Sequence, residues 1–273
     1  MEVTKLLKEN NFEFAKKFGQ NFITDTNLLN AIIADCNLLS TDEVLEIGTG
    51  AGTLTQAISK KVHKVVTYEI DKRLKDILSE TLKDCPNVTL NFDDIMEKDL
   101  LEIEKQFTKP YHLVANLPYY ITTPIIFKFL NSKKLKSLNI MVQKEVAERI
   151  VAKSGKDYGI LSIMIDFYAN AKIARIVNRN LFTPPPNVDS AIVQIAITHK
   201  YDCNEDLFSL LVHKSFAMRR KTLYNNLKQA FNLSTPQLAD LIAPHPLTTR
   251  AEQLSTQDFV NLTTKLERIL QIK

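Results

Sequence analysis

The sequence has few cysteines, scattered histidines and no long apolar run. Its three cysteines, Cys36, Cys85 and Cys203, lie far apart with no CxxC spacing, so neither a disulfide framework nor a zinc site is expected. No apolar stretch reaches 18 residues, and the first 20 residues lack a signal-peptide pattern. We therefore predict a cytoplasmic protein with no bound metal and no membrane partner.

Composition and charge are close to average. Hydrophobic residues make up 45% and charged residues 24%, which excludes a mainly disordered chain. The net charge of +4 is compatible with a nucleic-acid partner but does not indicate one by itself. The 273 residues suffice for one long α/β domain, or for a large domain followed by a small one.

Short apolar segments alternate with amphipathic ones as far as residue 198. Strands are expected at 43–48, 63–71, 87–94, 111–117, 138–143, 171–178 and 190–198. Helices are expected between them, for example at 54–61, 72–83 and 145–153. This alternation predicts an α/β fold with a mostly parallel sheet covered on both faces. Only a loop separates the last two strands, which favours an antiparallel edge.

The pattern changes after residue 199, where only helical periodicity remains. Ser234 and Ser255 each begin a segment of the type STPQ or STQD, which is typical of a helix start with a capping residue. We therefore predict two domains, 1–199 and 200–273, of which the second is small and helical.

Three of the six glycines lie in EIGTGAG, directly after the first expected strand. Gly48, Gly50 and Gly52 would let the backbone turn tightly and approach a ligand closely. Glu69 ends the next strand and is placed to accept hydrogen bonds from ribose hydroxyls. Asp94, preceded by a second aspartate, ends the third strand and could accept from an adenine amine, while the Ile95 amide meets a ring nitrogen. The alternatives are a tight turn, a capping acid and solvated turn residues.

The glycine loop favours one nucleoside ligand over others. A dinucleotide fold would show GxGxxG, and a phosphate-binding loop would show GK[ST], which is absent. The arrangement EIGTGAG instead resembles the S-adenosylmethionine loop of class I methyltransferases. That ligand has no phosphate and needs no phosphate-binding lysine.

A second motif, Asn116-Leu117-Pro118-Tyr119, ends the fourth expected strand. It resembles the [DNS]-[IP]-P-[YF] motif of methyltransferases that act on planar amines. The Asn116 oxygen and the Leu117 carbonyl could accept both amine hydrogens, Pro118 would rigidify the loop, and Tyr119 offers a flat face to an unstacked base. The alternative is an irregular loop with a core tyrosine.

A second aromatic ring is expected on the other face of such a base. The segment NLFTPPPNVDSAIV supplies Phe182, placed by the stiff segment Pro184–Pro186. The alternative is a hairpin loop in which Phe182 fills the core.

Taken together, these motifs resemble the small-subunit ribosomal RNA adenine N6-dimethyltransferase family over nearly the whole chain. KKFGQNFITD at 16–25 and FAMRRKTLYNNLK at 216–228 add to the motifs above, in the family order. The resemblance implies a class I methyltransferase domain at 1–199 with a helical RNA-binding domain at 200–273. It implies four methyl transfers from S-adenosylmethionine to two adjacent adenosines near the 3′ end of small-subunit RNA, in the immature 30S subunit. The cofactor residues it implies are Asn21, Ile23, Gly48, Gly50, Glu69, Ile70, Asp94, Ile95 and Asn116.

The basic residues are expected to face RNA. Arg219, Arg220 and Lys221 form a charged run that is either a phosphate-binding surface or a solvated face. Lys16 and Lys17 are expected to help at the N-terminal edge. Nothing in the sequence indicates more than a monomer.

Three other interpretations remain open. A ribosome-assembly or transcription factor that keeps the fold without catalysis would not need the glycine loop with its acids. The macrolide-resistance branch, which methylates large-subunit RNA, shares the core motifs, but FGQNF and RRKTLYNNL favour the small-subunit branch. DNA adenine or protein glutamine methyltransferases more often carry NPPY than NLPY.

Overall fold

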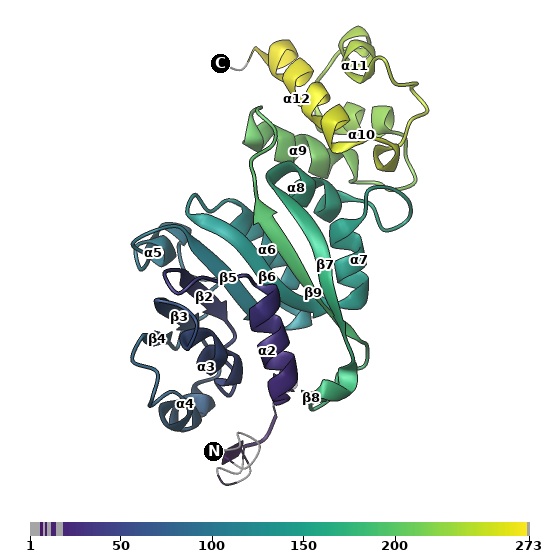
Figure 1. Cartoon of the computed structure of the whole chain (residues 1–273). Coiled ribbons are helices and arrows are strands. Elements are labelled where there is room, and N and C mark those ends of the chain that lie inside the picture. Colours follow the sequence, from purple (N-terminus) through teal and green to yellow (C-terminus); the bar gives the residue numbers. More distant parts are fainter. Residues whose placement is uncertain (1–5, 8, 10–11, 15–18, 272–273) are drawn as a thin grey trace. The chain divides into compact units, whose positions relative to one another are not determined.

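The computed structural model describes residues 6–7, 9, 12–14 and 19–271 (Figure 1). The chain forms two compact units, Met1–Ala147 with Lys172–Ile197, and Glu148–Ala171 with Thr198–Lys273. A single cut after residue 199, as predicted from the sequence, does not follow these units, because 148–171 belongs with the helical one. Helix α8 (Ile160–Tyr168) explains this, since its Phe167 stacks on Phe208 of helix α9 (Glu205–Ser215), with ring centroids 4.0 Å apart.

The first unit is built around a seven-stranded sheet in the order β4-β3-β2-β5-β6-β9-β7. The strands are β2 (Glu43–Ile47), β3 (Lys64–Tyr68), β4 (Val88–Asn91), β5 (Tyr111–Asn116), β6 (Leu135–Gln143), β7 (Ala169–Val177) and β9 (Ser190–Ile197). The pairs from β4 to β6 are parallel, and β9 runs antiparallel to β6. The predicted fold class, a mostly parallel sheet with an antiparallel edge, is confirmed.

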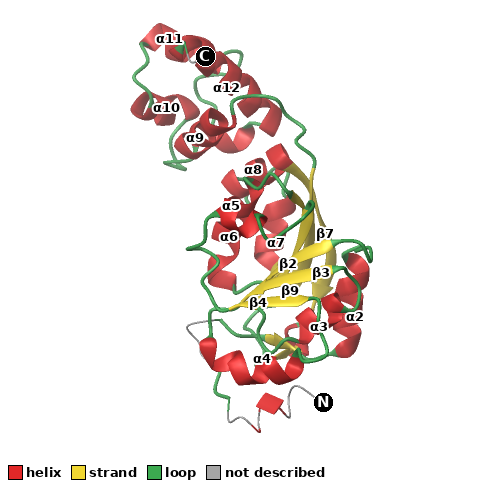
Figure 2. Ribbon diagram, turned by 90° about the vertical axis from the view of Figure 1, so that its left-hand side faces the viewer, coloured by secondary structure: helices red, strands yellow, loops and turns green. Residues whose placement is uncertain are grey.

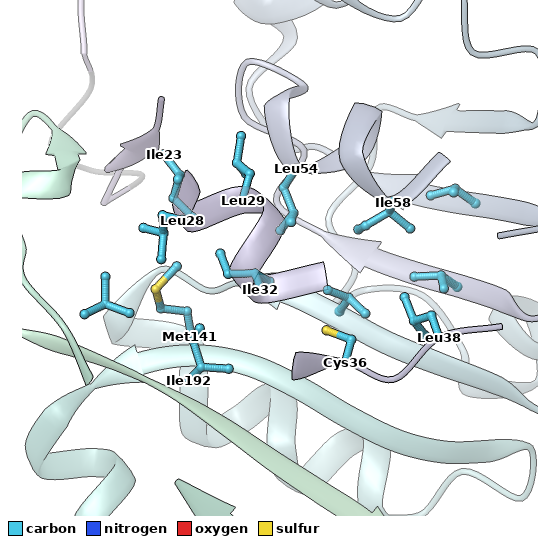
Figure 3. Close-up of a cluster of buried hydrophobic side chains, with 14 of the residues drawn as sticks. Ile23, Leu28, Leu29, Ile32, Cys36, Leu38, Leu54, Ile58, Met141 and Ile192 are labelled. Carbon is cyan, nitrogen blue, oxygen red and sulfur yellow. The ribbon is translucent and has the colours of Figure 1, made fainter. Parts of the chain in front are cut away.

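Helices lie on both faces of the sheet (Figure 2). They are α2 (Thr26–Asp35), α3 (Thr53–Ser59), α4 (Lys75–Thr81), α5 (Leu100–Glu104) and α6 (Thr122–Leu130), whereas α7 (Lys144–Val151) begins in this unit and continues into the second. Leu28, Ile32 and Ile58 of α2 and α3 pack against the sheet residues Met141 and Ile192 in one buried cluster (Figure 3). Burial of this apolar face is the main source of stability for such a layer.

A separate two-stranded sheet joins distant parts of the chain. Strand β1 (Phe22–Ile23) pairs antiparallel with β8 (Phe182–Thr183), so that Ile23 lies opposite Phe182. The Thr53 hydroxyl donates to the Ile23 carbonyl at 2.8 Å and fixes this strand to the start of α3. The N-terminal segment is thereby held beside the glycine loop.

The second unit is helical, as the periodicity predicts. Besides α8 and α9 it contains α10 (Leu223–Ala230), α11 (Thr235–Ile242) and α12 (Thr256–Leu270). Both predicted helix starts are confirmed, because Ser234 and Ser255 form capping boxes with Gln237 and Asp258.

Candidate active site

The glycine loop links β2 to α3 in a backbone conformation that favours glycine. Gly48, Gly50 and Gly52 have φ angles of +79°, +56° and +84°. A Cβ on Gly52 would lie 2.9 Å from the Thr81 side chain, and one on Gly50 would lie 3.1 Å from the Phe22 ring. The loop therefore combines a left-handed turn with close packing, and substitutions at these positions would be strained.

Glu69 holds this loop from the end of β3. Its Oε2 accepts the Gly50 N–H at 2.8 Å, and its Oε1 accepts the Asp71 N–H at 2.8 Å. Burial raises the pKa of Glu69 above its ordinary value, and the two N–H donors limit the rise. A carboxylate can accept about four hydrogen bonds, so both oxygens retain capacity for a ligand.

The two aspartates after β4 differ in their contacts. Asp93 is exposed and pairs with Lys98, with the ammonium nitrogen 3.1 Å from the carboxylate. Asp94 accepts the Met96 N–H at 2.8 Å. Because Asp93 has a cation as partner, Asp94 is the better candidate for binding a neutral amine.

A pocket forms where these strands end, and we call it the glycine-loop pocket. It is lined by Gly19, Gln20, Asn21, Phe22, Ile47, Gly48, Gly50, Tyr68, Glu69, Ile70, Asp93, Asp94, Ile95, Asn116, Leu117, Pro118, Tyr119, Tyr120, Ile121 and Ile125. Eight of the nine residues predicted to hold a cofactor are among them, and Ile23 is not. The position agrees with the rule that ligands of open α/β sheets bind beyond the carboxyl ends of the strands.

The Asn116-Leu117-Pro118-Tyr119 loop forms one wall of this pocket. Asn116 Nδ2 donates to the Asn21 carbonyl at 2.8 Å, which orients the side chain and leaves its Oδ1 as an acceptor. Among the described residues, no donor reaches that Oδ1 or the Leu117 carbonyl. The Tyr119 hydroxyl is 2.8 Å from Ser190 Oγ, and burial raises the pKa of Tyr119. Two unpaired oxygens therefore lie beside a fixed ring.

A second cavity opens on the other side of the same wall, and we call it the Tyr119 slot. It is lined by Phe14, Gly19, Gln20, Asn21, Tyr119, Gln143, Pro184, Pro185, Pro186 and Asn187. Gly19, Gln20, Asn21 and Tyr119 line both cavities. A group in the slot would therefore lie next to a ligand in the glycine-loop pocket.

Two predicted site residues lie in the core instead. Phe182 is 3% exposed and Ile23 is 2% exposed, and both belong to the same buried apolar cluster, in which Figure 3 labels Ile23. The β1–β8 pairing places them opposite each other, and neither lines a cavity described above. The structure therefore agrees with the alternative interpretation, in which Phe182 fills the core. The slot has a triproline wall, and its second aromatic residue is Phe14, which is 38% exposed.

Sequence reasoning missed several residues of the glycine-loop pocket. Phe22 lines it in place of Ile23, and Tyr120 stands 61% exposed next to the backbone of Gly19. Gln20 donates to Asp71 Oδ2 at 2.7 Å. Phe22 and Gln20 flank the predicted Asn21 in the sequence, and this adjacency is the signal that could have identified them as lining residues.

The predicted basic residues are not part of either cavity. Arg219 and Arg220 are exposed and Lys221 is half-buried in the turn between α9 and α10. Lys16 and Lys17 lie outside the described residues. In the described part of the chain, no cluster of three His, Cys, Asp or Glu side chains could hold a metal ion, and no helix is long and apolar enough to span a membrane.

Solved structures with this fold are methyltransferases. A dimethyladenosine transferase from Plasmodium falciparum superposes with a TM-score of 0.75 at 27% identity, covering 90% of this chain and 98% of that one. The 23S rRNA methyltransferase ErmE superposes with a TM-score of 0.70 at 23% identity, covering 90% and 100%, and shows the fold alone. The fold and the glycine-loop pocket thus define a class I methyltransferase.

Sequence relatives narrow this class to one family. The model of the ribosomal RNA adenine dimethylases matches residues 11–266. A ribosomal RNA small subunit methyltransferase A from Latilactobacillus sakei is 44% identical, covering 94% of this chain and 91% of that protein. One from Bacillus pumilus is 40% identical, covering 97% and 96%. The chain belongs to the ribosomal RNA adenine dimethylase family, and its methyl donor is S-adenosylmethionine.

The glycine-loop pocket fits this donor. Glu69 retains acceptor capacity for ribose hydroxyls, and Asp94 can accept from an adenine amine. Among the described lining residues there is no lysine or arginine, as expected for a ligand without phosphate. The uncharged acceptors of Asn116 and Leu117 line the same pocket, and Asn116 donates to the carbonyl of Asn21, a residue that lines both cavities.

Proposed function

We propose that this protein dimethylates the N6 amines of two adjacent adenosines near the 3′ end of small-subunit ribosomal RNA, in the immature 30S subunit. The proposal rests above all on the two unpaired oxygens of Asn116 and Leu117 beside the Tyr119 ring. Its relatives named ribosomal RNA small subunit methyltransferase A support the choice of the small subunit.

The chemistry requires help from these residues because an adenine amine is a poor nucleophile. Its lone pair is delocalised into the ring, and hydrogen bonds from its two hydrogens to Asn116 Oδ1 and the Leu117 carbonyl would favour a tetrahedral nitrogen. The same oxygens stabilise the positive charge that develops on the nitrogen. S-adenosylmethionine supplies an electrophilic methyl group. The nitrogen would lose one proton to water as or after the methyl group arrives, so catalysis by this chain consists of orientation and matched acceptors, and no strong general base is required.

The Tyr119 slot would receive the target base after it leaves its stack. None of the described residues that line it is charged, and the Tyr119 ring is fixed by Ser190. Stacking of a base on an aromatic ring contributes about 1–3 kcal/mol. Base extrusion of this kind is the general solution for enzymes that modify a base.

The deciding experiment compares three nucleic-acid substrates. Purified protein is incubated with labelled S-adenosylmethionine and with immature small subunits, large subunits or adenine-containing DNA, and the products are identified by mass spectrometry. We expect dimethyladenosine in the small-subunit RNA alone. Label in large-subunit RNA would favour the macrolide-resistance branch, and no label in any substrate would favour the non-catalytic factor.

We further propose that the helical unit binds RNA through Arg219, Arg220 and Lys221. None of the three side chains forms an ion pair with another described residue, so their charges are available to phosphates. Replacing all three by alanine should reduce the slope of log affinity against log salt by about two, at roughly 0.7 per contact. A matched control replaces the exposed Lys60, Lys61 and Lys105 of the first unit. Equal slopes for both variants would show that Arg219, Arg220 and Lys221 form a solvated surface that does not contact RNA.

We extend this proposal to the oligomeric state of the protein, its metal content and its compartment. We infer that the protein acts as a monomer, without a metal ion, in the cytoplasm where its RNA substrate is assembled. Lys16 and Lys17 are also proposed to contact RNA. Sedimentation and metal analysis of the active protein test the first two statements directly.

A further inference from the structure

Strand β6 ends with an amide whose role the reaction described above does not explain. Asn116 on β5 pairs with Met141 on β6. Gln143 is two residues beyond Met141, and side chains two apart in a strand lie on the same face, about 7 Å along. Asn116 and Gln143 therefore project from the same face of neighbouring strands.

The structure also ties Gln143 to Tyr119. Both residues line the Tyr119 slot. Gln143 pairs with Ser190 across the antiparallel β6–β9 ladder, and Ser190 Oγ is the 2.8 Å partner of the Tyr119 hydroxyl. One residue of β9 thus lies against both the ring that would stack on the base and the strand position that carries the amide.

The Gln143 amide has no hydrogen-bond partner among the described residues, whereas the side-chain amides of Gln20 and Asn21 in the same slot are engaged. Asn21 Nδ2 donates to the Gly19 carbonyl at 3.1 Å, and Gln20 Nε2 donates to Asp71. Gln143 is half-buried, so its two N–H donors and one acceptor are directed to a confined site. A confined amide beside a base-stacking ring is suited to recognition of a base edge.

We propose that Gln143 donates a hydrogen bond to a ring nitrogen of the target adenine and thereby sets its register in the slot. This rests on the proposed function, in which Asn116 and Leu117 accept both amine hydrogens. Adenine then still presents N1 and N7 as acceptors next to the amine, and a glutamine N–H complements either. Guanine presents an oxygen where Asn116 and Leu117 need a donor, so the amide and the two acceptors together select adenine.

The test couples a protein change to a base change. Small-subunit particles are reconstituted on RNA whose target adenosines are adenosine, 1-deazaadenosine or 7-deazaadenosine, and kcat/KM is measured. Gln143→Ala should lower kcat/KM for adenosine about 10-fold, the usual size of one lost buried hydrogen bond. Gln143→Glu, which keeps the shape but has no N–H donor, should lose at least as much. Gln257→Ala on the exposed face of α12 is the matched control and should equal the wild type.

The coupling gives the decision. One deaza analogue should slow the wild type about 10-fold and cause no further loss in Gln143→Ala, while the dissociation constant of S-adenosylmethionine stays unchanged in all variants. If the loss in kcat/KM from Gln143→Ala multiplies with the loss from each analogue, or if Gln143→Glu keeps full activity, the role of Gln143 is overturned while the proposed function stands. A wild type that methylates no particle overturns the proposed function and this role with it.

Discussion

The glycine-loop pocket and the Tyr119 slot share a wall but differ in charge. The pocket is lined by the carboxylates Glu69, Asp93 and Asp94, whereas no described residue lining the slot is acidic or basic. A sulfonium cofactor is a cation and a nucleobase is neutral and flat. In the proposed function the cofactor occupies the acidic pocket and the base occupies the uncharged slot, so the two ligands would be separated by charge in one cavity and by shape in the other.

Asn116 lines the pocket and donates to Asn21, which lines both cavities, so its loss should have the largest effect. We expect Asn116→Ala to lower the rate of methyl transfer at least about 100-fold, the typical cost of removing one acceptor or donor aligned with transition-state charge. Single-turnover transfer with saturating cofactor measures this. Asn116→Asp separates the two roles of the side chain, because it keeps an oxygen acceptor and loses the 2.8 Å donation to the Asn21 carbonyl. A rate for Asn116→Ala within a few-fold of the wild type would contradict the proposed role.

Tyr119 lines both cavities, and its ring is the proposed stacking face of the slot. Tyr119→Ala should lower kcat/KM for RNA by about 10- to 100-fold, since stacking contributes about 1–3 kcal/mol, and cofactor affinity should change little. Tyr119→Phe keeps the ring and loses only the contact with Ser190. We expect this variant to retain most activity. If the phenylalanine variant were as impaired as the alanine one, the hydroxyl and not the ring face would carry the function.

Glu69 tests the pocket without the slot. Glu69→Ala should raise the dissociation constant of S-adenosylmethionine several-fold, because it removes the ribose acceptor and releases the Gly50 N–H. Glu69→Gln, which retains one side-chain oxygen, should be milder. Calorimetric titration measures both, with the KM for RNA as the internal control. Unchanged cofactor affinity in Glu69→Ala would remove this residue from the site.

The two cavities also differ in how well the sequence predicted them. Gly48, Glu69, Asp94 and Asn116 each follow an apolar run that becomes a parallel strand, so the strand pattern alone brings them to one edge. The slot depends on β8, a two-residue strand paired with β1 from the other end of the chain. Two residues show no alternation, so the sequence could not decide which side chains face the cavity.

The same limit explains the two residues placed in the core. In β1 the choice between Phe22 and Ile23 depends on one step of register, and the pairing turns Phe22 to the pocket and Ile23 to the cluster. Phe182, opposite Ile23, is buried with it. The observed unit boundary differs from the predicted cut after residue 199 for a similar reason. Helical periodicity reveals the apolar surface of α8 but not which helices cover it.

A smaller effect concerns Glu46, a buried carboxyl beneath the glycine loop. Glu46 is 0% exposed, lies opposite Thr67 on β3, and neither of its carboxyl oxygens has a hydrogen-bond partner in the described structure. Burial raises the pKa of Glu46 from 4.5 to about 8. The folded protein therefore keeps a proton at this site that the unfolded chain has already released at intermediate pH.

The sign of the pH dependence follows from this difference. Between pH 4.5 and about 8 the folded state binds more protons at Glu46 than the unfolded state does, so this residue lowers the free energy of unfolding as pH rises through that window. Glu46→Gln removes the titration, so we expect its stability relative to the wild type to increase from pH 5 to pH 8. Chemical denaturation at both pH values measures the change, and a stability difference that does not vary with pH would show that Glu46 is ionised in the fold.

Tyr119 is the one ionisable side chain among the described slot residues and its pKa is raised, so the slot should stay neutral over the same range. Any pH dependence of RNA affinity in that window would then have to arise outside the slot.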